Sequence, residues 1–147
     1  MLQRLTIVFL ALFITTISFA QTDAKIEVVK HNHVALHVKD IAASTKFYKE
    51  VMGLEPVAVP DSLKAIRSWF KLGTDQQIHL LAGRDFDVKN DRNGSHFALF
   101  VTSIAAAEKY LTQHKLSFHK QVRFDGAVQI YVADPDGYLI ELNEVKR

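Results

Sequence analysis

The chain has 147 residues, of which 48% are hydrophobic and 23% charged, and its formal net charge is +2. This length and composition suit one domain or a pair of small modules with a real core, which excludes a wholly disordered chain. No run of like charges reaches five residues, so a nucleic-acid-binding arm is not expected. With no cysteine and seven histidines, disulfide frameworks, cysteine nucleophiles and iron–sulfur clusters are excluded. A metal site would have to use His, Asp and Glu.

The first twenty residues have the pattern of a secretory signal peptide. Arg4 is the only charge in the first 22 residues, and an apolar run extends from Leu5 to Phe19. Ser18-Phe19-Ala20 then supplies small residues at the first and third positions of a cleavage site. The run is shorter than the roughly twenty residues that span a bilayer, which favours cleavage over a retained anchor. We therefore expect a mature chain that starts at Gln21, leaves the membrane, and is periplasmic or secreted in a bacterium.

The remaining chain predicts the same order of elements twice. The first set is a strand near 33–39, a helix from Ile41 to Met52 ended by Gly53, and strands near 54–59, 65–72 and 77–82. The second set is a strand near 95–102, a helix from Ile104 to His114, and strands near 116–123, 127–133 and 138–143. These elements predict an α+β fold of two paired β-α-β-β-β modules. Module one covers about 29–83, a linker about 84–94, and module two about 95–146.

An internal repeat supports this division. When residues 33–46 are aligned with residues 96–109, eight of fourteen positions are identical. A second match aligns Ile78-His79-Leu80 with Ile140-Glu141-Leu142. Two copies at this spacing indicate a duplicated module, because solenoids need three or more shorter repeats.

The repeat superposes four residues of the types that bind metals. His33 aligns with His96 at the start of the first strand of each module, and His79 aligns with Glu141 in the middle of the last. Strand alternation places Glu141 with Leu139 and Asn143 on one face, and His79 with Gln77 and Leu81. Each residue alone would suit a packed or solvent-facing side chain. If the modules pack about a pseudo-two-fold axis, the four form a His₃Glu set suited to a divalent transition metal.

The opening and closing segments resemble the vicinal oxygen chelate superfamily. The opening match is residues 33–40 (HVALHVKD), then Phe47-Tyr48 and residues 52–54 (MGL). The closing match is residues 134–138 (DPDGY) and residues 140–142 (IEL). That superfamily includes glyoxalase I, bleomycin- and fosfomycin-resistance proteins, methylmalonyl-CoA epimerase and extradiol dioxygenases. The resemblance covers about residues 29–144 and implies a curved, metal-holding cleft built by two paired modules.

The resemblance implies that His33, His79, His96 and Glu141 are the metal ligands. His79 departs from the family pattern, because glyoxalase I usually has Glu there and the epimerase Gln. Three imidazoles and one carboxylate would leave a divalent site near +1, which polarises a bound oxygen more strongly than a neutral site. The expected ion is one divalent transition metal; Ni, Zn, Fe, Mn and Co are not distinguished.

The implied function is a secreted, metal-dependent, glyoxalase-like lyase or isomerase. It would act on a small substrate that chelates the metal through oxygen, with Glu141 and His79 as the groups that move protons. An Fe(II) or Mn(II) dioxygenase of extradiol type is an alternative if His79 does not bind the metal. A non-catalytic binding module of the bleomycin-resistance kind is another. Whether the modules pair within one chain or across a homodimer stays open.

Further residues are candidates for substrate binding. The resemblance points to His37, where glyoxalase I commonly has Arg, and to Arg92, which matches a basic position of that family. Arg67, Trp69 and Tyr131 lie on strands expected to line the cleft, although a surface ion pair or core packing would also explain them. The remaining histidines, His31, His114 and His119, are interpreted as surface or loop residues.

Overall fold

The structure is a computed structural model that describes residues 25–146. The expected signal peptide and its cleavage site therefore lie outside the described residues. Within the described part of the chain, no helix is long and apolar enough to cross a membrane. Contacts divide the chain into Met1–Lys30 and His31–Arg147, and every helix and strand below belongs to the second unit.

Module one forms a four-stranded sheet in the order β1-β4-β3-β2. Its elements are β1 (His33–Val38), α1 (Ile41–Lys46), a π-helical turn η1 (Phe47–Val51), β2 (Pro56–Val57), a 3₁₀ turn η2 (Asp61–Leu63), β3 (Arg67–Leu72) and β4 (Gln76–Ala82). Strands β1 and β4 are parallel, whereas β4, β3 and β2 are antiparallel.

Two local predictions in module one need correction. The helix expected to run from Ile41 to Met52 changes to π-helical geometry at Phe47, and both Phe47 and the adjacent Tyr48 are buried. A π-turn is wider than an α-turn, which suits burial of two consecutive aromatic side chains. The strand expected near 54–59 shrinks to Pro56–Val57, since proline has no N–H for a ladder.

Module two repeats the topology with sheet order β5-β8-β7-β6. Its elements are β5 (Phe97–Val101), α2 (Ile104–Gln113), β6 (Phe118–Val122), β7 (Val128–Ala133) and β8 (Leu139–Glu144). Ser103 caps α2 by accepting a hydrogen bond from the Ala106 N–H, and the Glu144 carboxylate accepts one from the Ile104 N–H. The predicted α+β fold of two β-α-β-β-β modules is confirmed.

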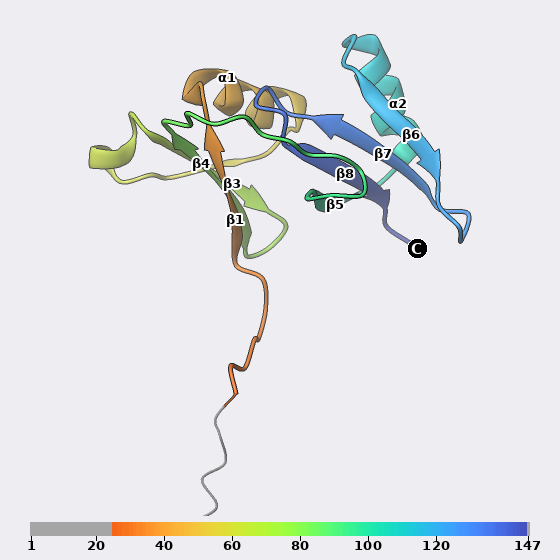
Figure 1. Cartoon of the computed structure of the whole chain (residues 1–147), viewed down its shortest axis with the longest axis horizontal. Helices are drawn as coiled ribbons and strands as arrows, with labels where there is room; N and C mark the ends of the chain where they lie inside the picture. Colours follow the sequence, from red (N-terminus) through yellow and green to blue (C-terminus); the bar gives the residue numbers. More distant parts are fainter. Residues whose placement is uncertain (1–24, 147) are drawn as a thin grey trace, which may run out of the picture. The chain divides into compact units, whose positions relative to one another are not determined.

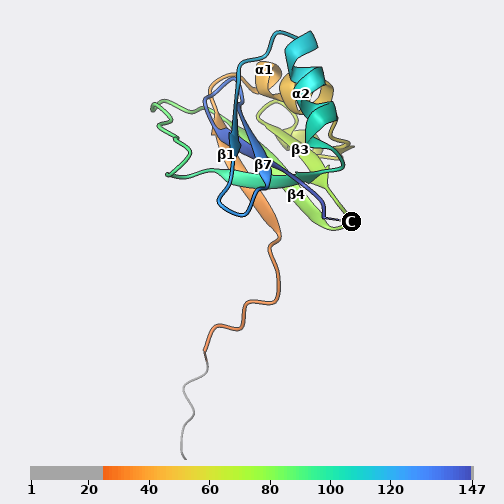
Figure 2. The same ribbon diagram turned by 90° about the vertical axis from the view of Figure 1, so that its right-hand side faces the viewer.

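Both modules bury one face of their sheet in a shared core. The helices α1 and α2 lie on the same side of the strands in two perpendicular views (Figures 1 and 2). The core contains residues of both sheets, of η1 and of α2: Leu36, Val38, Phe47, Tyr48, Phe70, Ile78, Leu80, Ile104, Leu111, Ile130, Val132, Ile140 and Leu142. Burial of this apolar surface is the main stabilising contribution. The opposite face of each sheet does not take part in this core.

A polar clamp ties the two modules together beside α1. The carboxylate of Asp136, in the turn between β7 and β8, accepts hydrogen bonds from the Lys39 N–H, the Ser44 hydroxyl and the Arg84 guanidinium. Nearby, the buried Tyr48 hydroxyl donates to Asp134 at 2.9 Å. These bonds connect segments about ninety residues apart, so they fix the turn of module two against the helix of module one.

Candidate metal centre

The four predicted ligands occupy equivalent rows of the two sheets. In module one, Ala35, His79 and Trp69 lie side by side across β1, β4 and β3. In module two, Ala98, Glu141 and Tyr131 lie in the same order across β5, β8 and β7. His33 and His96 each lie two residues before the alanine of their row. The strand register therefore places the repeated residues at equivalent positions in the two sheets, as the sequence repeat predicts.

The first half-site, which we define as His33 and His79, is a stack of rings. The two imidazoles are parallel, with centroids 4.2 Å apart, and the Trp69 indole stacks on His79 at 4.7 Å. His33 Nδ1 donates to Asn32 Oδ1 at 2.5 Å, and His79 Nε2 donates to Gln77 Oε1 at 2.8 Å. Because an amide oxygen only accepts, each ring keeps its other nitrogen as a free lone pair.

Burial, followed by the nearby His33 ring, lowers the pKa of the His79 imidazole. His79 is therefore neutral near pH 7, which is the form that binds a metal. A hydrogen bond from one ring nitrogen to a protein oxygen is also the usual way in which a metal-binding histidine is oriented. The first half-site thus has the properties of a pair of preoriented metal ligands.

The second half-site, which we define as His96 and Glu141, is centred on a buried carboxylate. Glu141 Oε2 lies 2.8 Å from His96 Nε2 and accepts a hydrogen bond from the Tyr131 hydroxyl at 2.8 Å. Its other oxygen accepts hydrogen bonds from the side-chain amides of Asn143, at 2.7 Å, and Gln129. The charge is therefore compensated by surrounding donors, as burial of a carboxylate requires.

The pKa values of this cluster follow from the same contacts. Burial acts to raise the pKa of Glu141, but hydrogen bonds from Asn143 and Tyr131 and the neighbouring His96 outweigh it and lower the pKa. Burial, together with the bond to Glu141, raises the pKa of Tyr131 to about 12. Near pH 7 the carboxylate is ionised and the Tyr131 hydroxyl remains a donor.

The contact between His96 and Glu141 fits a bound cation. His96 Nδ1 lies 3.0 Å from the Gly94 carbonyl oxygen, so Nδ1 carries a proton and donates it there. In the neutral ring, the Nε2 lone pair then faces the Glu141 oxygen, and two acceptors repel each other. A proton on Nε2 or a cation shared by both groups removes this conflict. Imidazole nitrogen and carboxylate oxygen are together suitable donors for a divalent transition metal.

The two half-sites do not come together within one chain. Among residues 25–146, no three His, Asp or Glu side chains are grouped in a way that could hold a metal ion. His33, His96 and the neighbouring Ala35 and Ala98 are exposed, so each ligand-bearing face is open to solvent at its first strand, whereas Glu141 and Tyr131 are buried. The modules of one chain pack through the helix-covered faces instead. Each chain therefore presents two separate ligand pairs.

The predicted substrate-binding residues are spread over several environments. Trp69 and Tyr131 contact His79 and Glu141, as described above. His37 is half-buried, and its Nε2 donates to the Ala82 carbonyl at 3.1 Å. Arg67 donates to the carbonyl of its own neighbour, Ile66. The structure brings neither His37 nor Arg67 into contact with a predicted ligand.

Arg92 lies next to a histidine that the sequence did not single out. Its guanidinium is 2.6 Å from His119 Nε2 and 3.1 Å from Gln121 Oε1. Gln121 in turn donates to the Tyr131 hydroxyl at 3.4 Å, which connects Arg92 to Glu141 through hydrogen bonds. His119 is exposed on β6 opposite Tyr131, so it is a surface residue, as interpreted, and it lies on a strand and not in a loop.

Several polar residues around the ligands were not predicted as site residues. Gln77 shares a strand face with His79, and Asn143 shares one with Glu141. Strand alternation predicted these positions but gave no indication of a role at the site. Gln129 and Gln121 are neighbours across β7 and β6, and only the pairing of these strands reveals that they support Tyr131 and Glu141. Asn32 was missed because it precedes the strand.

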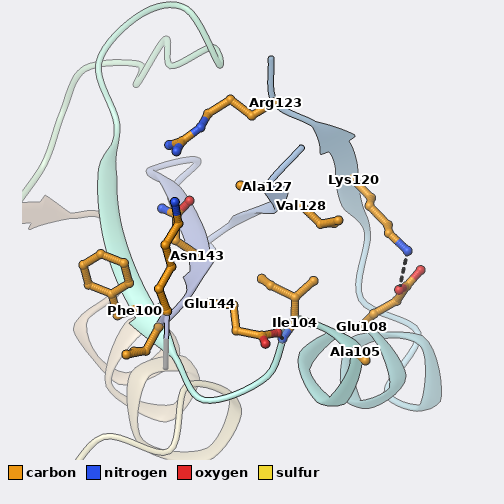
Figure 3. Close-up of a pocket in the computed structure, with 12 residues that line it drawn as sticks. Phe100, Ile104, Ala105, Glu108, Lys120, Arg123, Ala127, Val128, Asn143 and Glu144 are labelled. Atoms are coloured by element: carbon orange, nitrogen blue, oxygen red, sulfur yellow. Dashed lines mark hydrogen bonds and ion pairs between the residues drawn. The ribbon is translucent and has the colours of Figure 1, made fainter. Parts of the chain in front are cut away.

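A cavity of the described residues lies away from the predicted ligands. It has a volume of about 940 Å³ and lies between α2, the turn that joins β6 to β7, and the end of β8. Its apolar floor includes Ile104 and Val128, while Lys120 pairs with Glu108 at its rim (Figure 3). None of the four predicted ligands lines it. Asn143, which donates a hydrogen bond to Glu141, lines this cavity and links it to the second half-site.

Comparison with known proteins supports the assignment of the fold. Residues 30–142 match the family model of the Glyoxalase/Bleomycin resistance protein/Dioxygenase superfamily. A virulence protein of Salmonella typhimurium is 32% identical over 123 residues, which cover 77% of this chain and 82% of that protein. A protein named glyoxylase I 4 of Arabidopsis thaliana is 26% identical over 119 residues, which cover 76% of this chain and 68% of that protein.

A solved structure agrees with these sequence matches. A glyoxalase family protein from Bacillus anthracis superposes with a TM-score of 0.69 at 26% identity, covering 84% of this chain and all of that one. The matched region includes both half-sites and both β-α-β-β-β modules. The chain belongs to the Glyoxalase/Bleomycin resistance protein/Dioxygenase superfamily, also called the vicinal oxygen chelate superfamily.

Proposed function

We propose that two copies of this chain build a composite metal centre that catalyses a glyoxalase-type lyase or isomerase reaction. In each centre, His33 and His79 of one copy face His96 and Glu141 of the other. The supporting observation is that the four residues are prepared as ligands in pairs, yet no chain brings the pairs together. A two-fold symmetric dimer joins the pairs twice and gives two identical centres.

The donor set is suited to a divalent transition metal. Each imidazole has one ring nitrogen bonded to a protein oxygen. The other nitrogen of His96 faces Glu141, which supplies one negative charge. A bound divalent ion would supply Lewis-acid polarisation of two substrate oxygens. The set of three histidines and one carboxylate leaves a net charge near +1, which favours an enolate-like species over the neutral carbonyl.

The side chains around the centre would transfer the proton that leaves the substrate carbon. Glu141 is ionised at neutral pH, so it can accept a proton from the carbon next to a polarised carbonyl. The Tyr131 hydroxyl keeps one oxygen of that carboxylate in place and, with its raised pKa, remains a donor. The protonated Glu141 would then return this proton to the adjacent carbon, which restores the carboxylate, while the neutral His79 would hold the metal on the opposite side. Trp69 would cover the substrate and exclude water on that side.

The surroundings of the second half-site suit a substrate that carries an anionic group. Arg92 has no carboxylate partner among the described residues, and His119 and Gln121 are its hydrogen-bonding neighbours. A carboxylate or similar anion at this position would meet the guanidinium while its chelating oxygens reached the metal. We therefore propose a small anionic substrate with two adjacent oxygen functions.

Subunit complementation tests the composite centre. Two differently tagged chains, one with His33→Ala and the other with His96→Ala, are co-expressed, and the mixed dimer is purified through both tags. One centre of that dimer then carries both substitutions and the other carries neither. We expect about half of the wild-type metal content, measured by elemental analysis after dialysis, and none in either single-variant dimer.

The matched control combines His96→Ala with Glu141→Gln. Both substitutions fall in the second half-site, so every centre of the mixed dimer is damaged and no metal should return. Equal metal content in the two mixed dimers would contradict the composite centre.

Activity on the hemithioacetal of methylglyoxal and glutathione should follow metal content. Oxygen consumption with iron or manganese bound would instead favour a dioxygenase, and metal-free ligand retention a binding module.

We also propose that the protein is exported. The support is the charged, apolar and small-residue pattern of the first twenty residues. The intact mass of protein recovered from the periplasm should correspond to a chain that starts at Gln21. A mass that includes residues 1–20 would mean a retained anchor.

A further inference from the structure

The free edge of β5 opens into a groove that has the shape of a strand-binding site. Strand β5 is at the edge of its sheet, so one row of its backbone N–H and C=O groups has no partner strand among residues 25–146. A cavity of about 540 Å³ runs along this edge and is lined by four consecutive residues, 98–101. Its opposite wall is formed by the β3–β4 turn, residues 73–76, and by Met52, Leu54 and Leu72. An extended segment with apolar side chains fits such a groove.

The chain also contains a segment with those properties. Residues 25–32 precede β1 and contain Ile26, Val28 and Val29, whose exposed fractions are 93%, 82% and 86%. β-Branched residues favour strands, and their alternation places Ile26 and Val28 on one face and Val29 on the other. Three large apolar side chains exposed within four residues are typical of a surface that is covered by a partner.

The composite centre brings the segment and the groove together. This step rests on the proposed function. If His33 of one copy and His96 of the other bind one ion at about 2.0–2.1 Å, their nitrogens lie within about 4 Å of each other. The segment ends directly before His33, and β5 begins directly after His96. Eight extended residues reach about 26 Å, whereas β5 spans about 17 Å.

We propose that residues 25–32 of one copy add a strand to the β5 edge of the second copy. The segment leads away from His33 while β5 leads away from His96, so the pairing is antiparallel. Its apolar side chains enter the groove beside Leu54 and Leu72 and meet Phe100, which is 75% exposed in the single chain. The exchange is mutual in a symmetric dimer, so each metal centre is bordered by one such strand.

Cysteine cross-linking between separately tagged copies of the full-length chain tests this pairing. The natural sequence has no cysteine, so each substitution adds the only thiol. Chains with Val28→Cys or Val29→Cys, which together sample both faces, are each mixed with chains carrying Phe100→Cys and mildly oxidised. We expect a disulfide-linked pair of differently tagged chains from at least one combination, because cross-strand neighbours meet the distance requirement. Thr112→Cys on exposed α2 should give none with either arm variant.

A second variant keeps the proposal testable if Phe100→Cys disturbs the fold. Ile26→Asp combined with Val28→Asp should weaken dimerisation at least tenfold in analytical ultracentrifugation. Phe124→Asp, which alters an equally exposed residue in the β6–β7 turn, should leave it unchanged. Absence of a disulfide between differently tagged chains in both combinations, or unchanged dimerisation of the Asp variant, would overturn the strand exchange. The composite centre would fail separately, through the absence of complementation between His33→Ala and His96→Ala.

Discussion

The two half-sites share one backbone geometry and differ in chemistry. In both sheets, the ligand of the last strand has an aromatic neighbour on the adjacent strand, Trp69 beside His79 and Tyr131 beside Glu141. In module one that neighbour stacks on a neutral ring, whereas in module two it donates a hydrogen bond to a carboxylate. The two modules therefore have the same backbone positions for these residues. Their side chains differ, and the negative charge, that of Glu141, lies in the second half-site.

This difference in charge explains why more polar side chains surround the second half-site than the first. A neutral imidazole needs only one oriented hydrogen bond and a ring to pack against. A buried carboxylate must be compensated on both oxygens, and Tyr131, Gln129 and Asn143 do this for Glu141. The first half-site orients ligands, and the second also supplies the charge that a divalent ion requires.

The largest expected effect comes from removing the negative charge of Glu141, which distinguishes the second half-site from the first. Glu141→Gln should lower metal affinity by more than about a hundredfold, because loss of partners beyond the ligands alone costs about 10–100-fold. His79→Ala should cost only about tenfold, since water can replace a neutral imidazole. Titration of the purified dimer with zinc or cobalt measures both. Glu108→Gln, which alters a surface ion pair with Lys120, should change nothing, and equal losses at Glu141 and His79 would contradict the asymmetry.

The second prediction concerns the Asp136 clamp, which joins the two modules that carry the half-sites. The side chains of Asp136 and Arg84 are only 3% and 8% exposed, so Asp136→Ala leaves a buried, unpaired guanidinium. We expect the melting temperature to fall by roughly 10 °C, with metal affinity of the folded protein little changed. Asp61→Ala, which removes an exposed ion pair with Lys64, is the control and should have little effect.

The pH dependence of this loss has a defined sign. Burial acts to raise the pKa of Asp136, but hydrogen bonds from the Lys39 N–H, Arg84 and Ser44 outweigh it and lower the pKa. A carboxyl with a lowered pKa stabilises the fold above its unfolded pKa and loses that contribution as pH falls through the folded value. The difference in unfolding free energy between wild type and Asp136→Ala should therefore narrow below about pH 4. A difference that widens in acid would contradict this assignment.

The smallest expected effects compare the two aromatic neighbours. Tyr131→Phe removes a hydrogen bond to Glu141 and should weaken metal binding by about tenfold. Trp69→Phe keeps a ring on His79 and should cost less than about threefold. Calorimetric titration measures both, with Tyr110→Phe as a control that removes only a surface hydrogen bond to Glu50. An equal or larger loss for Trp69→Phe would show that stacking, not the hydrogen bond, dominates.

Much of the fold was predictable because the two periodicities are strong and occur twice. Alternation and helical spacing located both long helices and seven of the eight strands to within about two residues at most ends. The failures have local causes. Pro56 has no N–H for a ladder, and β2 is limited to Pro56–Val57. The end of the first helix is π-helical from Phe47, where two aromatic side chains are buried.

Less of the site was predictable. The repeat identified the four candidate ligands and their strand faces, because a side chain's face follows from its position in the strand. The roles of Gln129, Gln121 and His119 depend on which strands are neighbours, and single-strand alternation does not contain that information. Arg67, predicted to bind substrate, lies on β3 opposite Leu81 and donates to the Ile66 carbonyl; its role stays a prediction.

By itself, the sequence determined the duplicated module, the alternation that turns His79 and Glu141 toward the same type of face, and the family resemblance. Only the tertiary structure decided which faces of the two modules meet. Apolar burial drives the helix-covered faces into a common core and the Asp136 clamp holds them there, so the ligand faces are left apart and open. That choice depends on packing between segments about a hundred residues apart, which no local pattern encodes.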